Sequence, residues 1–160
     1  KIAQNLLLVE KRKGDGSVKF ESFFIENENN EIIDTILTGQ TVYFCFKLKI
    51  FESNAKINLG YSIHSEKEET FTILYSSYQN KEFRVIEKGN HTVKCKIEDF
   101  PLSENTYYIG GRILNNGIEA DWPMTKIGEM TVIKGDFYKT GNIGLWGKSK
   151  VLIKGQWEIH

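Results

Sequence analysis

The sequence is poor in cysteine and proline, has no excess of either charge, and contains no long hydrophobic run. Its 160 residues include 2 cysteines and 2 prolines, and 21 basic residues balance 21 acidic ones. Zero net charge argues against a nucleic-acid-binding protein, because phosphate binding requires a basic surplus. It equally argues against a polybasic membrane patch. The apolar runs are about as long as a strand, too short to cross a membrane, and residues 6–9 are too short to form a signal peptide.

The two cysteines, Cys45 and Cys95, are too few for a disulfide scaffold. Their spacing is similar to that of the bridge in immunoglobulin domains, but the Trp and Tyr that accompany that bridge are missing, and Val93 stands at the Tyr position. Cys45 alternates with Phe44 and Phe46, which we expect in the core, so its side chain should point away from the core. We therefore predict two reduced thiols in a cytoplasmic protein.

Motifs of catalysis and of metal or nucleotide binding are also missing. His64, His91 and His160 do not stand at metal-ligand spacing, and there is no zinc-protease, nucleophile-elbow, calcium-loop or P-loop pattern. The glycines at 141, 144 and 147 lack the strand-to-helix context of a phosphate-binding loop. The sequence therefore predicts a protein that is not an enzyme, with no metal and no cofactor.

What the sequence does contain is repeated alternation of apolar and polar residues, which is typical of strands with one buried face. The clearest examples are residues 42–50, 57–64 and 107–114. Shorter candidates follow at 18–25, 31–36, 70–76, 83–87, 91–97, 119–122, 126–133 and 151–159. Turn residues separate them, including the hairpin pair Asn116-Gly117. We predict an all-β fold, an antiparallel β-sandwich.

The expected organisation is a single domain with an unusual C-terminal part. Residues 1–12 form a linker or leading strand, residues 13–134 the sandwich core, and residues 135–149 a Gly-rich connector. Residues 150–160 form a last strand, which can pair with its own sheet or with that of a partner. Exchange of such a strand is a low-cost route to a dimer.

Five segments of the sequence resemble, in order and spacing, those of a known family. They are a basic-Gly-x-Gly start of the first strand (12–20), a Thr-Gly-polar-x-Val turn (37–42), a Pro-Leu corner that ends in Tyr (100–107), an acidic strand end (119–122) and a Val-x-x-Gly-Asp-x-Tyr-x-Thr-Gly segment (132–141). Over residues 13–157 the chain is similar to the C-terminal domain of Wzt-type proteins, the ATPase subunits of ABC transporters that export O-antigen and related polysaccharides. One departure is Asn105, where the family has Gly; the change is mild because Asn tolerates a left-handed backbone.

This resemblance implies an immunoglobulin-like β-sandwich that forms a homodimer by exchanging its C-terminal strand. It implies binding of an exported polysaccharide, at its modified non-reducing end, on the face of a sheet. The implied partners are the ATPase domain and membrane permease of the transporter, at the inner face of the membrane, and no nucleic acid. A neutral chain suits this role, since sugars are bound by aromatic rings and hydrogen-bonding groups.

Strand parity selects the residues of the candidate sugar-binding face. On the sides of the strands that point away from the core lie Asn58, Ser62, His64, Tyr108 and Arg112, joined by Asp121 and Trp122 at the end of the neighbouring strand. Tyr75 and Tyr78 are weaker candidates, and we expect Trp146 and Trp157 to pack in the dimer instead.

A structural role is the alternative for each of these residues. Tyr108 would then cover a sheet edge, Trp122 would belong to the core, Arg112 would pair with Asp121 or a strand neighbour, and His64 would be an ordinary surface residue. The matching alternative function is a structural dimerisation or docking domain without glycan specificity.

Overall fold

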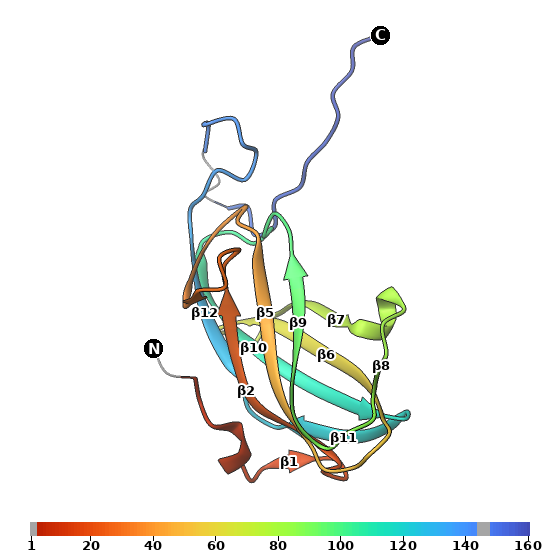
Figure 1. Ribbon diagram of the computed structural model, residues 1–160. Coiled ribbons are helices and arrows are strands. Elements are labelled where there is room, and N and C mark those ends of the chain that lie inside the picture. The colour runs from red at the N-terminus through yellow and green to blue at the C-terminus, as the bar shows by residue number, and fades with distance from the viewer. Residues whose placement is uncertain (1–2, 144–147) are drawn as a thin grey trace.

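The computed structural model describes residues 3–143 and 148–160, and two β-sheets packed face to face make up most of it (Figure 1). In chain order the elements are η1 (Leu6–Leu8), β1 (Arg12–Lys13), β2 (Val18–Glu26), β3 (Ile32–Ile33), β4 (Thr35–Leu37), β5 (Val42–Ile50), β6 (Ala55–Ser65), β7 (Thr70–Tyr75), η2 (Ser76–Gln79), β8 (Phe83–Val85), β9 (Gly89–Ile97), β10 (Asn105–Asn115), β11 (Ile118–Pro123) and β12 (Gly128–Ile133). The two η elements are short 3-10 turns. Within the described ranges, no helix is long and apolar enough to span a membrane.

The two sheets differ in size and make up a sandwich, as the sequence predicted. The small sheet has the strand order β3-β2-β5-β9, and the large sheet has eight strands around the central pair β6 and β10. Figure 1 shows β2, β5 and β9 in front of β6 and β10. One edge of β10 pairs with β6, while its other edge pairs with β12 near its start and with β11 near its end. The pairing of β4 with β12 is parallel, an exception to the antiparallel arrangement.

The core lies between the sheets and is built from the alternating positions. Val42, Phe44, Phe46, Leu48 and Ile50 on β5 are all buried, and they face the buried alternate residues of β6 and β10. Aromatic rings meet across the layer: the centroids of Phe44 and Tyr61 lie 5.3 Å apart, edge to face. Each such side chain contributes about 2–3 kcal/mol on burial, so the predicted alternation is also the main source of stability.

Turn geometry agrees with the sequence at the β10–β11 hairpin. Asn116 and Gly117 have φ values of 51° and 79°, the left-handed pair that a two-residue turn requires. Asn105 is not among the residues with positive φ; it begins β10 in extended conformation. The Asn side chain at this position is therefore accommodated without a left-handed backbone.

Two strand predictions need correction or qualification. Residues 31–36 do not form one strand, because the extended segment is interrupted by a bend at Asp34. As a result β3 pairs with β2 in the small sheet, and β4 pairs with β12 in the large sheet. The physical reason is that the chain crosses between the layers there. At the C-terminus, Val151 forms a single bridge with Leu102, and residues 152–160 form no strand within the single chain. Pairing of that segment with a second chain stays a prediction.

Both cysteines are free thiols, as predicted. On β5, Phe44 pairs with Cys95 of β9 and Cys45 with Lys94, so the two thiols lie on opposite faces of the small sheet. Cys45 points away from the core as expected, yet it is fully buried. Burial, aided by the nearby negative charge of Glu26, raises the pKa of Cys45 to about 12.

Candidate functional site

A groove of about 760 Å³ lies on the outer face of the large sheet. Its walls come from β6, β7 and β10, from the end of β11 and from the loop at 124–126. Among its lining residues are five of the seven predicted site residues: Ser62, His64, Tyr108, Arg112 and Trp122. These five side chains come from three strands, β6, β10 and β11, and they lie along one groove, on the outer face where the alternation predicted them.

The floor of the groove is formed by two glycines that are not among the predicted site residues. Gly60 stands opposite Arg112 in the register of β6 and β10, and Gly110 stands opposite Ser62. A Cβ atom at Gly110 would lie 2.7 Å from Oγ of Ser62, and one at Gly60 would collide with the ring of Tyr75. A glycine at an outward-facing position inside a strand often marks a site of close approach, and this signal was present in the alternation pattern.

One wall carries a row of hydroxyl groups on either side of His64. Oγ of Ser62 lies 2.6 Å from Nε2 of His64, and Oγ1 of Thr70 lies 3.0 Å from Nδ1. In a neutral imidazole one nitrogen donates and the other accepts, so the two hydroxyls play opposite roles toward the ring. The row therefore offers both donors and acceptors to a ligand in the groove.

Arg112 lies at the opposite side of the floor and is held from three directions. Its Nε donates to Glu119 at 2.8 Å, its guanidinium also donates to the hydroxyl of Tyr75 at 3.4 Å, and its Cζ lies 5.1 Å from the ring centroid of Trp122. Both hydrogen bonds raise the pKa of Arg112 above its ordinary value, and the bond to Tyr75 contributes more than the bond to Glu119. Trp122 is 38% exposed, so it belongs to the groove surface rather than to the core.

The aromatic rings of the groove are already in contact with cations. Nζ of Lys126 lies 4.1 Å from the centroid of Tyr108 and 2.8 Å from Oε2 of Glu129. The hydrogen bond to Glu129 raises the pKa of Lys126. Trp122 has Lys13 within 5.3 Å of its centroid in addition to Arg112. A ligand ring that stacks on this face of Tyr108 must therefore displace the ammonium group of Lys126.

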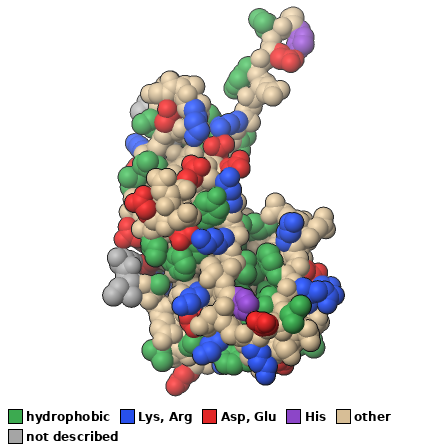
Figure 2. Space-filling model, viewed as in Figure 1, with side chains coloured by type: hydrophobic (Ala, Val, Ile, Leu, Met, Phe, Trp, Pro, Cys, Tyr) green, Lys and Arg blue, Asp and Glu red, His purple; other side chains and the backbone are tan. Residues whose placement is uncertain are grey.

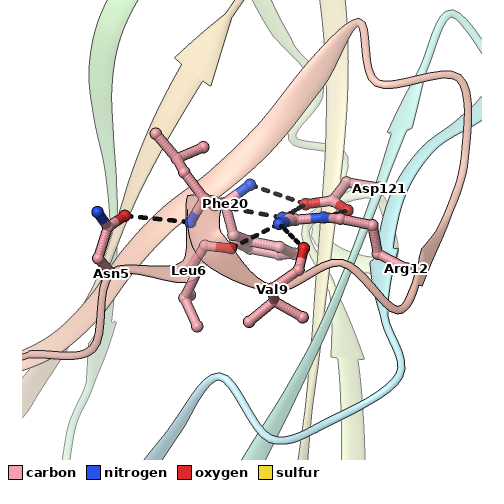
Figure 3. Close-up of polar contacts among 7 residues, drawn as sticks. Asn5, Leu6, Val9, Arg12, Phe20 and Asp121 are labelled. Carbon is pink, nitrogen blue, oxygen red and sulfur yellow. Dashed lines mark hydrogen bonds and ion pairs between the residues drawn. The ribbon is translucent and has the colours of Figure 1, made fainter.

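Asp121 does not belong to this surface, and its prediction as a site residue on the outer face is wrong. Consecutive residues of a strand face opposite sides, so Asp121 points inward where Trp122 points outward. Its carboxylate is 1% exposed and binds the guanidinium of Arg12 through two bonds of 2.8 and 2.6 Å (Figure 3). It also accepts a hydrogen bond from the backbone amide of Phe20 at 2.9 Å.

The same cluster connects the N-terminal segment to the sandwich. Nη1 of Arg12 donates to the carbonyl oxygens of Leu6 and Val9, and the Leu6 side chain is fully buried (Figure 3). Residues 6–12 therefore pack against the sandwich, and the segment ends in the short strand β1.

Asn58 also lies outside the groove and holds the backbone beside it. Its Oδ1 accepts hydrogen bonds from Oγ of Ser76 at 3.3 Å and from the amide of Ser77 at 3.1 Å, which fixes the start of η2. Of the remaining candidates, Tyr75 lines the groove, while Tyr78 packs against Tyr75 at 5.5 Å and is 67% exposed. Trp146 lies outside the described residues.

Charge on the rest of the surface is mixed. Figure 2 shows basic and acidic side chains interspersed over the face that carries the small sheet. Ion pairs such as Lys47–Glu21, with Nζ and Oε2 2.9 Å apart, account for this pattern. Among residues 3–143 and 148–160, no group of three or more His, Cys, Asp or Glu side chains is placed to hold a metal ion.

Together, the fold and the groove define a class: an immunoglobulin-like β-sandwich domain with an open polar and aromatic groove on one sheet. The family model of the Wzt C-terminal domain matches residues 9–123, so the chain belongs to the Wzt C-terminal domain family. A comparison with curated protein sequences found no match.

Solved structures agree with this fold. The crystal structure of the C-terminal domain of Wzt superposes with a TM-score of 0.71 and 14% identity, covering 98% of this chain and 96% of that one. A β-D-mannosidase from Dictyoglomus thermophilum gives a TM-score of 0.52 and 10% identity over 75% of this chain and 14% of the enzyme. At these identities the likeness concerns the fold alone.

Proposed function

We propose that this domain binds a polysaccharide in the groove of the large sheet and couples its recognition to export by an ABC transporter. The observation that carries the proposal is the composition of the groove. Three aromatic side chains, Tyr75, Tyr108 and Trp122, surround a glycine floor, with hydroxyl, imidazole and guanidinium groups between them. Sugar rings are bound in this way, through apolar contact on their faces and hydrogen bonds to their hydroxyls.

Family membership supports the transporter context. Wzt-type proteins are ATPase subunits of O-antigen exporters, so the proposed partners are an ATPase domain, fused or separate, and its membrane permease. The site of action is then the inner face of the membrane. The role is one of binding, and the ligand is the modified non-reducing end of the exported chain.

The C-terminal segment supports a second part of the proposal, a homodimer formed by strand exchange. Ile153, Trp157 and Ile159 are 77%, 96% and 99% exposed, and the tail extends away from the sandwich (Figure 1). Large apolar side chains at such exposure favour burial against a partner. This observation also favours the alternative function, a dimerisation or docking domain without glycan specificity.

Titration calorimetry with the polysaccharide of the source cell separates the two functions. We expect binding by the wild-type chain and loss of binding in Trp122→Ala and Arg112→Ala at unchanged melting temperature. Phe51→Ala, which changes an exposed aromatic residue that does not line the groove, is the matched control and should bind like wild type. If the wild-type protein forms dimers but binds no polysaccharide at millimolar concentration, the alternative function holds.

A further inference from the structure

Charge in the groove is arranged so that neither lining cation is left without a carboxylate. Arg112 binds Glu119 and Lys126 binds Glu129, each at 2.8 Å. Two further carboxylates, Glu66 and Glu68, line the rim. Among the described residues, four carboxylates therefore lie in or beside the groove, Glu66, Glu68, Glu119 and Glu129, against three cations, Arg112, Lys126 and Lys13.

We infer that the groove selects an uncharged sugar residue and disfavours one that carries a phosphate or carboxylate group, an inference that rests on the proposed function. An anion that approaches Arg112 meets the negative charge of Glu119 as well. Like charges brought together without compensation oppose binding, and they provide specificity against the wrong ligand.

An uncharged sugar meets no such penalty. Arg112 has five N–H donors, and among the described residues it uses them toward Glu119 and Tyr75, which leaves donors for a hydroxyl oxygen. The neighbouring carboxylate of Glu119 can accept a hydrogen bond from the same hydroxyl or the next one. The ion pair thus presents a donor and an acceptor side by side, which suits adjacent sugar hydroxyls, since each hydroxyl both donates and accepts.

The opposite side of the groove has the same dual character. Ser62 and Thr70 contact the two ring nitrogens of His64, so this wall also offers donors and acceptors without a fixed charge. The described polar groups of both walls therefore suit a ligand rich in hydroxyls.

The test uses inorganic phosphate as the probe, with binding followed by NMR at the backbone amides of Gly110 and Arg112. Glu119→Gln removes the charge that opposes an anion and keeps the shape of the side chain. We expect it to bind phosphate about fivefold more tightly than the wild-type chain, the scale of one surface charge pair. Glu21→Gln is the matched control, because Glu21 forms a similar ion pair, 2.9 Å from Lys47, on the other sheet. It should behave like wild type.

Equal phosphate binding by wild type and Glu119→Gln would overturn the inference. A second measurement compares one neutral polysaccharide that binds the wild-type chain before and after oxidation of its primary hydroxyls to carboxylates. We expect weaker binding after oxidation, and tighter binding would overturn the inference. Failure of every polysaccharide to bind would refute the proposed function, whereas the phosphate titration tests the groove charge by itself.

Discussion

Replacement of Asp121 tests whether this residue stabilises the fold or belongs to the binding surface. Its burial indicates the structural role, whereas its position at the end of the strand, beside Trp122, predicted the binding role. In Asp121→Asn the side chain keeps its size but loses its charge. Arg12, whose side chain is 9% exposed, is then left as a buried cation without a counter-charge. Breaking a buried ion pair in this way costs about 3–5 kcal/mol. For a domain whose total stability is about 5–15 kcal/mol, this is a large share.

The expected change is readily measured by urea unfolding followed by circular dichroism. A loss of about 4 kcal/mol corresponds to a fall of about 10 °C in the melting temperature of a domain of this size. Glu119→Gln provides a comparison, because its ion pair with Arg112 is partly exposed and should contribute at most about 1 kcal/mol.

If Asp121→Asn does not fold, a double variant still tests the role of the ion pair. Arg12→Met combined with Asp121→Leu removes both charges together and should recover much of the stability, since a buried pair can be replaced by apolar side chains. The opposite result would be a free energy of unfolding for Asp121→Asn within about 1 kcal/mol of wild type, together with loss of polysaccharide binding. That result would refute our assignment of Asp121 to the structural cluster.

Three further predictions concern the groove and the thiols. Gly110→Val places a branched side chain against Oγ of Ser62 on the floor, so we expect polysaccharide binding to fall at least tenfold while calorimetry finds the protein folded. Lys126→Ala uncovers the ring of Tyr108 and should strengthen polysaccharide binding about two- to fivefold, the scale of an exposed cation–π contact; weaker binding would show that the ammonium group itself contacts the ligand. Burial holds the pKa of Cys45 at about 12, so Cys45 should not react with a thiol reagent at pH 8 until the chain is unfolded. The raised pKa also makes the free energy of unfolding depend on pH. This contribution to stability is present below the unfolded pKa near 9 and is lost as the pH rises toward 12.

The strands and their buried faces could be predicted because alternation is a local property of the chain. Residues 42–50 and 57–63 each keep one face apolar for the whole strand, and the structure buries that face in both. The same regularity placed Ser62 and His64 correctly, since both lie inside a long strand, opposite to buried neighbours. The prediction for residues 31–36 failed because a short apolar run carries no information about which sheet it joins.

From the sequence, a site residue could be predicted only where the alternation along its strand was enough to place it on the outer face of the sheet. The pairing of Arg12 with Asp121 joins residues 109 positions apart, and no local pattern distinguishes it from the pairing with Arg112 that the sequence also allowed. Likewise, the register that sets Gly60 beneath Tyr75 and opposite Arg112 depends on how three strands align.

The sequence by itself determined an all-β sandwich, because hydrophobic periodicity and turn chemistry act over a few neighbouring residues. The Wzt C-terminal family was indicated by the resemblance of five sequence segments, and the family model shows it. Only the tertiary structure decided which polar side chains meet. It assigned Glu119 and Glu129 to the groove cations and buried Asp121 against Arg12. Those contacts arise from strand register and sheet packing across long stretches of chain, and they give the groove its charge balance.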